Sequence, residues 1–295
     1  LAAAQTFSID TELTNHLDQI IAVGMVPVQN RGPAVRDKVR RHGRTSYDQK
    51  QRERLTEENN QSQLALSSMM KDALHGGAVD GQIASAITGR YLSEMQTDID
   101  SVLSSTGGGF GDSSMAAQAL QTSLLSMAIG IEMGLDEDNI RLLGLVGLVH
   151  DWGMMKVPAR VRVAPHPLSS NDFHEIRKHP IHSLELIQKA SGMPGLVSLV
   201  AYQIHERPNG TGYPRGRSGN AIHQFARIVA VADAYTAMTN AKSYRPAFMA
   251  YAAIECLLRD ARKRNLDARV VRCLLIIQSL FPIGSLITLS DGSVG

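Results

Sequence analysis

The sequence predicts an all-α fold with a short β appendage at its C-terminal end. Three observations favour this class. Apolar residues recur at helical spacing along most of the chain, and glycine or capping residues stand where these stretches end. Aromatic residues make up only 5% of the chain, whereas β-strands are enriched in them.

The N-terminal region, residues 1–106, has a charged part and a helical part. Residues 31–60 hold nine Lys or Arg and five Asp or Glu, with almost no apolar periodicity. This composition predicts a solvated or partly disordered segment, with a basic contact surface for a partner as the alternative. Helical character begins at Gln61, and from Ile83 to Ile99 an apolar residue recurs every four positions. We expect this region to be a sensory, spacer or dimerising segment.

Three consecutive glycines follow Thr106 and predict a hinge. We place a domain boundary there, so that residues 107–295 form a second domain. Because Asp291-Gly292 is a turn signal, short strands are expected at 284–294. The helices expected in this domain are 114–133, 136–150, 171–189, 194–206, 221–240, 250–264 and 267–280.

Capping residues support the first two of these helices. Gly134 is suited to end the helix at 114–133, because glycine readily adopts the left-handed conformation that follows a helix. Asp136 is suited to begin the next one, because its carboxylate accepts hydrogen bonds from free backbone N–H groups.

Charge and cysteine content narrow the class of function. The net charge is +2, so the electrostatics do not point to nucleic acid or a membrane surface as a partner. No apolar stretch is long enough to span a bilayer, and we find no signal-peptide pattern. Cys256 and Cys273 are expected to be reduced, with a disulfide between them as the alternative. Together these features predict a cytoplasmic protein.

Two carboxylates stand where burial is costly without a partner. Asp151 and His150 directly follow the apolar run 142–149, which places a carboxylate and an imidazole at the edge of a core. Both are ligand types for Zn, Fe or Mn. Asp233 follows the apolar run 228–232, where a metal ion, an arginine or a helix N-terminus could compensate its charge.

Five motifs follow one another along the chain, and their joint order is more specific than any one of them. They are H-D at 150–151, K-H-P at 178–180, H-E at 205–206, N-G-T-G-Y-P at 209–214 and V-A-D-A-Y-T at 231–236. This order resembles the HD-GYP family, a branch of the HD superfamily best known as cyclic-di-GMP phosphodiesterases. The resemblance covers roughly residues 110–295. It implies an HD-superfamily helical bundle with a centre of divalent ions, Fe, Mn or Zn, whose bridging hydroxide attacks a phosphodiester.

The resemblance implies a role for each matching residue. Asp151 would bridge two ions and is the catalytic carboxylate. Tyr213 and Pro214 would help to form the wall that faces the nucleotide, and Lys242 and Arg245 would lie near the phosphates. The implied metal ligands are His150, Asp151, His179, His205 and Asp233.

Five positions depart from the family's pattern. Gln118 and Ile204 stand where histidine ligands are expected, so each of two ions would lose one histidine and keep three protein ligands. Three ligands can still hold a metal ion. Met154 replaces a lysine, Ser114 replaces a glutamate of three-metal members, and Asn209 replaces an aspartate.

Two residues could compensate for these changes. Lys156 could replace the lysine lost at Met154 as a catalytic group if the segment before Pro158 is extended, because residues two apart then share a face. Without such a replacement, the loss of one donor to developing charge typically costs roughly 10²–10³ in turnover. His182 could substitute as a ligand, although a helix turn separates it from His179.

These changes favour an HD-GYP-type domain that is weakly active or catalytically degenerate. We expect it to hold one or two divalent ions and to act as a signalling module. Its expected partners are a cyclic dinucleotide and a protein such as a diguanylate cyclase, and a homodimer is a further expectation. The alternative is an active phosphodiesterase for cyclic-di-GMP or a related cyclic dinucleotide. A hydrolase with another substrate is a third reading.

Overall fold

The computed structural model describes residues 28–39, 49–107 and 114–278. Helices joined by short loops make up most of these ranges, which confirms the all-α class. Within the same ranges the β pairings are isolated bridges, such as that between Asn209 and Ser218. The strands expected at 284–294 lie outside the described residues.

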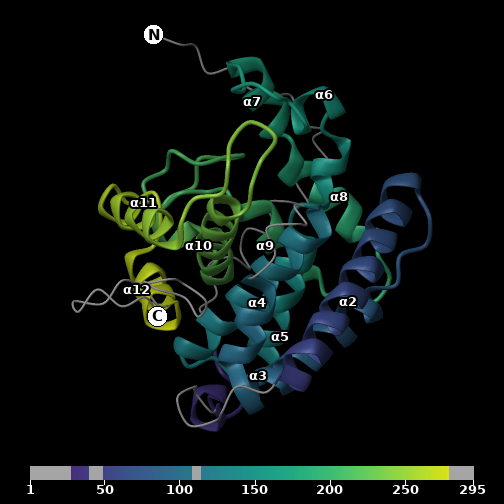
Figure 1. Ribbon diagram of the computed structural model, residues 1–295. Coiled ribbons are helices and arrows are strands. Elements are labelled where there is room, and N and C mark those ends of the chain that lie inside the picture. Colours follow the sequence, from purple (N-terminus) through teal and green to yellow (C-terminus); the bar gives the residue numbers. More distant parts are fainter. Residues whose placement is uncertain (1–27, 40–48, 108–113, 279–295) are drawn as a thin grey trace, which may run out of the picture.

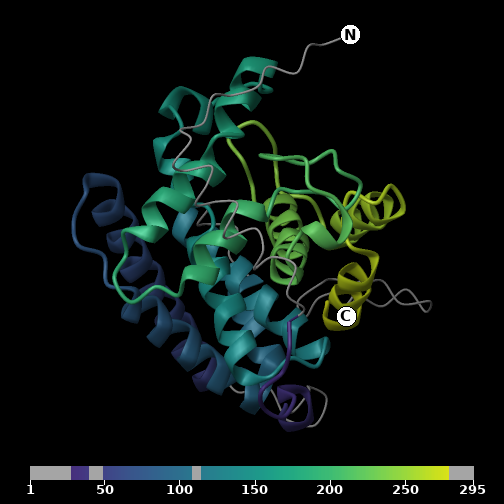
Figure 2. The ribbon, with the colours of Figure 1, turned by 180° about the vertical axis from the view of Figure 1, so that it is seen from behind.

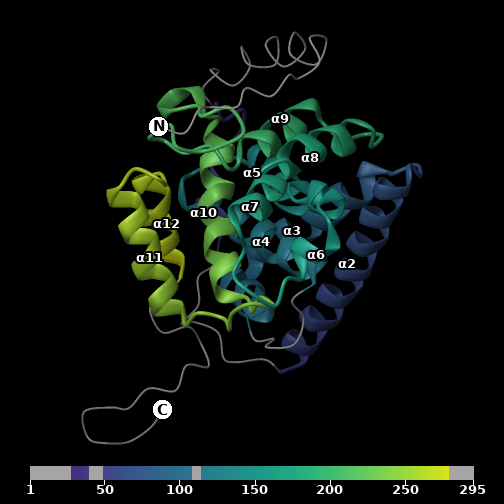
Figure 3. The ribbon, with the colours of Figure 1, turned by 90° about the horizontal axis from the view of Figure 1, so that it is seen from above.

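Figure 1 shows three central helices between two outer pairs. The central helices are α4 (Met115–Glu132), α5 (Glu137–Val149) and α10 (Gln224–Thr239). The outer pairs are α2 (Gln49–His75) with α3 (Gly81–Gly107), and α11 (Ala250–Arg262) with α12 (Ala268–Ile277). The view from above shows α10 between the α11–α12 pair and the other helices (Figure 3).

Shorter elements complete the bundle and carry most of the predicted site. They are η1 (Val35–Lys38), η2 (Trp152–Lys156), α6 (Ala159–Arg162), α7 (Ser170–Ile176), α8 (His179–Gln188), α9 (Gly195–Gln203) and η3 (Gly219–Ala221). From behind, the teal and green elements of this set lie between the blue α2–α3 pair and the yellow α11–α12 pair (Figure 2).

Helix α4 is buried on nearly all sides. Most of its residues are apolar or small, which is typical of a helix that other helices enclose, and α2, α3, α5, α10 and α12 all contact it. The Ser114 hydroxyl accepts a hydrogen bond from the Ala117 N–H and caps its first turn. Gly134, at φ +79°, follows its end in the left-handed conformation. Packing and caps therefore fix the first turn of α4, in which Gln118 lies.

The single helix expected at 171–189 is two helices, α7 and α8, so that prediction was wrong. Pro180 stands in the first turn of α8. Proline has no N–H to donate, so it fits the start of a helix but would break the hydrogen bonding of a continuous one. The break makes His179 the first residue of α8.

The helical start expected at Gln61 was wrong, because α2 begins at Gln49, although most of residues 49–60 are exposed, as expected of a solvated segment. Leu55 and Asn59 are buried there, and the Asn59 amide oxygen accepts a hydrogen bond of 2.6 Å from the Tyr91 hydroxyl of α3. The buried face of α2 thus mixes apolar residues with hydrogen-bonded polar ones, and a hydropathy pattern does not reveal it.

One continuous hydrophobic core extends from Leu55 of α2 to Leu274 of α12. The domain boundary expected after Thr106 adjoins residues 108–113, which the structure does not describe, and it stays a prediction. Among the described residues no helix is both long and apolar enough to cross a bilayer. Cys256 and Cys273 are free thiols.

Candidate metal centre

The five predicted metal ligands meet at one place. His150 caps the C-terminal end of α5 and Asp151 follows it, His179 opens α8, His205 follows α9, and Asp233 lies inside α10. Their ligand atoms form two groups of three, in each of which all atoms lie within 4.8 Å of one another. The His179 group is Asp151, His179 and His205, and the His150 group is His150, Asp151 and Asp233. Asp151 belongs to both.

The spacing within both groups suits a small divalent cation. In the His179 group, Nε2 of His179 lies 2.8 Å from Nε2 of His205 and 3.3 Å from Oδ1 of Asp151. In the His150 group, Nε2 of His150 lies 3.5 Å from Oδ1 of Asp233 and 3.7 Å from Oδ1 of Asp151. Ligand atoms bound to one ion at about 2.1 Å lie about 3.4 Å apart in tetrahedral geometry, so these separations require little rearrangement.

Backbone contacts orient two of the imidazoles. Nδ1 of His150 lies 2.9 Å from the Gly147 carbonyl oxygen, and Nδ1 of His179 lies 2.7 Å from that of Ile176. A carbonyl only accepts, so each Nδ1 carries a proton, and Nε2 is the ring nitrogen that could bind a metal ion once it has lost its own proton. Metal-binding histidines usually have this second contact.

The chemistry of the ligand set also fits a cation. Nε2 of His150 and Oδ1 of Asp151 are buried and have no hydrogen-bond partner among the described residues. Burial alone would lower the pKa of His150, but the carboxylates of Asp151 and Asp233 raise it to about 9. Burial alone would raise the pKa of Asp151, but the positive charges of His150 and His179 hold it far below its usual range. The carboxylates thus create a strong local demand for positive charge, which a divalent ion would meet.

Close packing of η2 against α8 brings Asp151 to His179. The Gly153 N–H donates to the Ser183 hydroxyl at 2.8 Å, and that hydroxyl donates to the His150 carbonyl oxygen at 2.5 Å. A side chain at position 153 would collide with the carbonyl oxygen of His179. Glycine is therefore required two residues after Asp151.

Tyr213 forms one wall of the centre. Its ring stacks on His205 with centroids 4.9 Å apart and an angle of 6° between planes. Burial raises the pKa of its hydroxyl, and the nearby carboxylates raise it further, so the phenol stays protonated. Pro214 follows it, half-buried. Sequence reasoning missed Arg177, whose guanidinium lies 5.6 Å from the centre of the Tyr213 ring. Only its place two residues before His179 could have pointed to it.

The two basic residues expected near the phosphates have different surroundings. Nζ of Lys242 donates to the amide oxygen of Gln118 at 2.6 Å, and the carboxylates of Asp233 and Asp151 favour its charged form. The Arg245 guanidinium instead donates to the carbonyl oxygens of Met238 at 3.1 Å and Ala237 at 2.5 Å. Arg245 therefore secures the C-terminal end of α10, and these contacts give no support to a role at the phosphates.

The positions that depart from the family's pattern are filled in ways that suit the packing. Ile204 is completely buried. Met154 is half-buried in η2, and Ser114 serves as the cap of α4. The Asn209 amide accepts from the Thr211 N–H at 3.1 Å and donates to the Lys263 carbonyl oxygen at 3.1 Å, which ties its loop to the α11–α12 turn.

The extended segment expected around Lys156 was wrong. Residues 152–156 form the 3-10 helix η2, in which residues two apart do not share a face. The Lys156 ammonium pairs with Glu185 at 2.9 Å, and these contacts do not support it as a replacement for the missing lysine. Nδ1 of His182 also lies near Glu185, at 3.7 Å, and His182 belongs to neither group.

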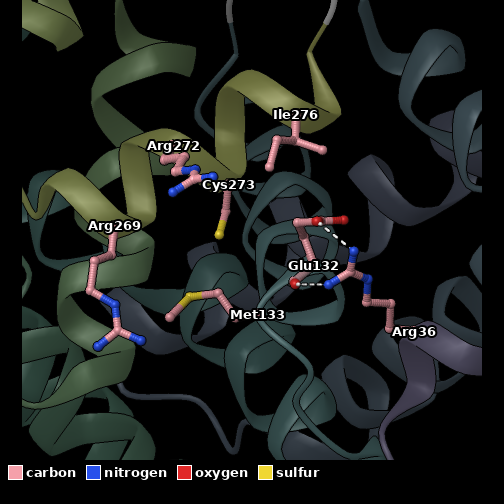
Figure 4. Close-up of a pocket in the computed structure, with 7 residues that line it drawn as sticks. All are labelled: Arg36, Glu132, Met133, Arg269, Arg272, Cys273 and Ile276. Carbon is pink, nitrogen blue, oxygen red and sulfur yellow. Dashed lines mark hydrogen bonds and ion pairs between the residues drawn. The ribbon is translucent and has the colours of Figure 1, made fainter.

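A pocket of about 370 Å³ lies elsewhere, between η1, the end of α4 and α12 (Figure 4). Arg36 pairs with the buried Glu132 across its edge at 3.3 Å, and Cys273 lines it. Gln118 and Glu132 are fourteen residues apart on α4. This separation corresponds to about 20 Å along the helix. The pocket is therefore not part of the metal centre.

Comparisons with known proteins agree with the motif order. The model of a family described as HD domain matches residues 111–270. A cyclic di-GMP phosphodiesterase of Pseudomonas aeruginosa is 29% identical over 231 residues, which are 78% of this chain and 55% of that protein. The cyclic di-GMP phosphodiesterase response regulator RpfG of Xanthomonas campestris is 32% identical over 167 residues, 56% of this chain and 44% of that protein.

Among solved structures, Bd1817 of Bdellovibrio bacteriovorus, described as an HDG"Y"P protein, matches with a TM-score of 0.65 at 18% identity. The match covers 91% of this chain and 79% of that one, and at this identity it shows the fold alone. The chain spans about half the length of the curated relatives named above.

Proposed function

Because this chain belongs to the HD domain family, we propose that it is an HD-GYP-type domain of cyclic-di-GMP signalling with a thinned metal centre. Its residues would hold one or two divalent ions with three protein ligands each. It would turn over substrate slowly or not at all and act mainly as a nucleotide- or protein-binding module. We further propose that residues 1–106 form a separate N-terminal region, in keeping with a family match that begins at residue 111.

One observation carries this proposal. Both histidine positions that depart from the family's pattern are occupied by side chains already committed to other contacts. Ile204 is buried and has no lone pair, and the Gln118 amide oxygen accepts a hydrogen bond from the Lys242 ammonium. Neither group of three can therefore complete its ligand set without a change in structure.

The metal, when bound, would supply a Lewis acid and an activated water for attack on a phosphodiester. The chain's own residues would position the substrate. Tyr213 offers a flat face beside His205, and Arg177 offers a positive charge above it. Lys242, whose ammonium is hydrogen-bonded to Gln118, is a further basic group that could contact a phosphate.

An active phosphodiesterase for a cyclic dinucleotide is the second candidate function. It is favoured by the assembly of five ligands from four segments into two groups that share Asp151. Open catalytic sites use three protein ligands, so the arrangement is compatible with turnover.

Elemental analysis of the purified protein, paired with cyclic-di-GMP hydrolysis in added Mn²⁺, tests the proposal. We expect bound metal, turnover at least about 100-fold below that of an intact relative assayed alongside, and no metal in Asp151→Ala. Turnover equal to the relative's, abolished by Asp151→Ala, would establish the second candidate instead. If the folded protein contained no metal, the proposed metal centre would be wrong, and only a role in binding a nucleotide or a protein would remain.

A further inference from the structure

Three arginines line the pocket between η1, the end of α4 and α12. Figure 4 shows Arg36 of η1 with Glu132 on one side of it, and Arg269 and Arg272 of α12 on the other. Arg269 and Arg272 are three positions apart, so they lie on the same side of α12. Two elements far apart in the sequence therefore place positive charge around one hollow of about 370 Å³.

The first of these arginines, Arg36, already has a partner. Its guanidinium pairs with the Glu132 carboxylate at 3.3 Å, and the Glu132 side chain is only 4% exposed. The same guanidinium donates to the Glu132 carbonyl oxygen at 3.5 Å. These contacts offset both the carboxylate and the partial negative charge at the C-terminal end of α4. Arg36 and Glu132 therefore form a fixed edge of the pocket with little net charge.

Arg269 and Arg272 have no ion-pair partner among the described residues, and both are exposed. Asp267, the acidic residue nearest to them in the sequence, pairs with Arg227 at 2.9 Å and caps the start of α12. Asp100 lines a smaller neighbouring hollow that neither of the two arginines lines. Two positive charges therefore remain unmatched at the pocket.

These unmatched charges suit a phosphate monoester. The planar guanidinium group matches phosphate oxygens with pairs of parallel hydrogen bonds. A phosphate monoester carries a charge of about −1.5 to −2 at pH 7, which two arginines balance. A carboxylate or a phosphodiester carries a single negative charge and would balance only one of them.

The remaining walls and the size of the pocket suit a small organic body. Met133, Cys273 and Ile276 line it, and Ile276 is 49% exposed, so a bound molecule could cover apolar surface there. Pockets for small molecules have volumes of about 300–1,000 Å³. At about 370 Å³ this pocket lies near the lower end of that range, which favours a ligand no larger than roughly a mononucleotide.

We propose that this pocket binds a small-molecule phosphate monoester. Arg269 and Arg272 hold the phosphate, and the organic body lies against Met133 and Ile276. The site lies at the opposite end of α4 from the first turn, which carries Gln118. It is separate from the metal centre, and the inference does not depend on the proposed function.

Calorimetric titration with AMP as the probe tests this inference. The full chain is used without metal and with Asp151→Ala, so that an ion at the metal centre does not bind the phosphate. We expect AMP to bind at least about 10-fold more tightly than adenosine, which lacks the phosphate. Adding Arg269→Gln and Arg272→Gln together should weaken AMP binding at least about 10-fold, because charge-assisted hydrogen bonds are lost.

A matched variant and a labelling experiment control for charge and for place. Arg259→Gln removes an exposed arginine of α11 that does not line the pocket, and it should leave AMP affinity unchanged. In a Cys256→Ser chain, Cys273 is the remaining thiol, and it lines the pocket. Saturating AMP should slow its reaction with iodoacetamide at least about 3-fold, because a bound ligand covers the pocket wall.

Several outcomes would overturn the inference. They are no AMP binding at millimolar concentration, unchanged binding in the double arginine variant that a thermal melt shows to be folded, or no protection of Cys273. A phosphoserine peptide that bound more tightly than AMP would assign the pocket to a phosphorylated protein instead of a small molecule. Failure of the metal centre would change none of these results, because the titrations are made without metal.

Discussion

The two ligand groups differ in what replaced the histidine that each lacks. Beside the His179 group the replacement is Ile204, an apolar side chain that is fully buried. Beside the His150 group it is Gln118, a polar side chain that holds the Lys242 ammonium. The first replacement leaves the group with three ligands and no competing charge. The second is hydrogen-bonded to an ammonium, so the two replacements differ in polarity and in the charge that lies next to them.

The comparison indicates that a missing ligand matters less than what occupies its place. Isoleucine adds no charge beside the His179 group, and the three ligand atoms of that group lie within 4.8 Å of one another. The Gln118 amide oxygen is instead occupied by the Lys242 ammonium, so it is not free to bind an ion. We therefore expect the His179 group to bind metal first.

The largest expected effect comes from Asp151→Ala, because Asp151 belongs to both groups. Loss of the shared carboxylate should weaken the tightest metal site at least about 100-fold, more than the loss of an outer-shell contact does. Isothermal titration with Zn²⁺ or Mn²⁺ measures the affinity. If Asp151→Ala bound the metal ion with an affinity within 10-fold of that of the unaltered chain, the ion would lie outside both groups.

A pair of alanine variants should separate the groups. His205→Ala removes a ligand of the His179 group only, and should weaken the tight site at least about 10-fold, since a direct ligand contributes no less than an outer-shell partner. His150→Ala removes a ligand of the His150 group only, and should change the same site by less than about 10-fold. The same titration measures the metal affinity of both variants. A larger loss of affinity in His150→Ala than in His205→Ala would show that the metal ion occupies the His150 group.

His223, a buried histidine outside both groups, has a pKa shifted in the opposite direction to that of His150. Burial and, to a smaller extent, the charge of Arg227 together lower the pKa of His223 to about 4. The folded pKa lies below that of the unfolded chain, so the unfolded state binds more protons as pH falls below about 6.5.

His223 should therefore cost about 2 kcal/mol of stability at pH 5 relative to pH 7. Urea unfolding of the metal-free protein at the two pH values measures this cost. His223→Gln removes the titration, so the difference in pH dependence between the two proteins isolates it. An equal loss in both would mean that His223 does not titrate in this range.

The smallest effect is expected for Ile204→His, and its sign should depend on metal. Without metal the buried imidazole has no partner, and the unfolding free energy should fall by about 1–2 kcal/mol. With Mn²⁺ the imidazole adds a fourth ligand to the His179 group and should recover that loss.

Melting temperatures with and without Mn²⁺ measure the difference for Ile204→His. Ile204→Val is the matched control, since it should lose about 1 kcal/mol in both conditions through reduced packing. A metal response of Ile204→His no larger than that of Ile204→Val would show that position 204 does not face the group.

Much of the site could be predicted from the sequence because its motifs are local. His150 and Asp151 are adjacent, and the helices that carry the other ligands have clear apolar periodicity. The helical class follows from the same periodicity. The break before Pro180 also had a local cause, but the continuous apolar pattern on either side concealed it.

Other features depend on contacts between distant segments. Gln118 and Lys242 are 124 residues apart, and nothing in their local sequence shows that they meet. The hydrogen bonds of Arg245 to carbonyl oxygens of α10 and the burial of Asn59 against Tyr91 are of the same kind.

The sequence by itself predicted the helical class and the five candidate ligands that the fold brings together. Only the tertiary structure decided that the Lys242 ammonium is bound by the Gln118 amide oxygen. The physical reason is that spacing along the chain encodes local conformation, whereas the partner of a buried charge is set by which helices pack together.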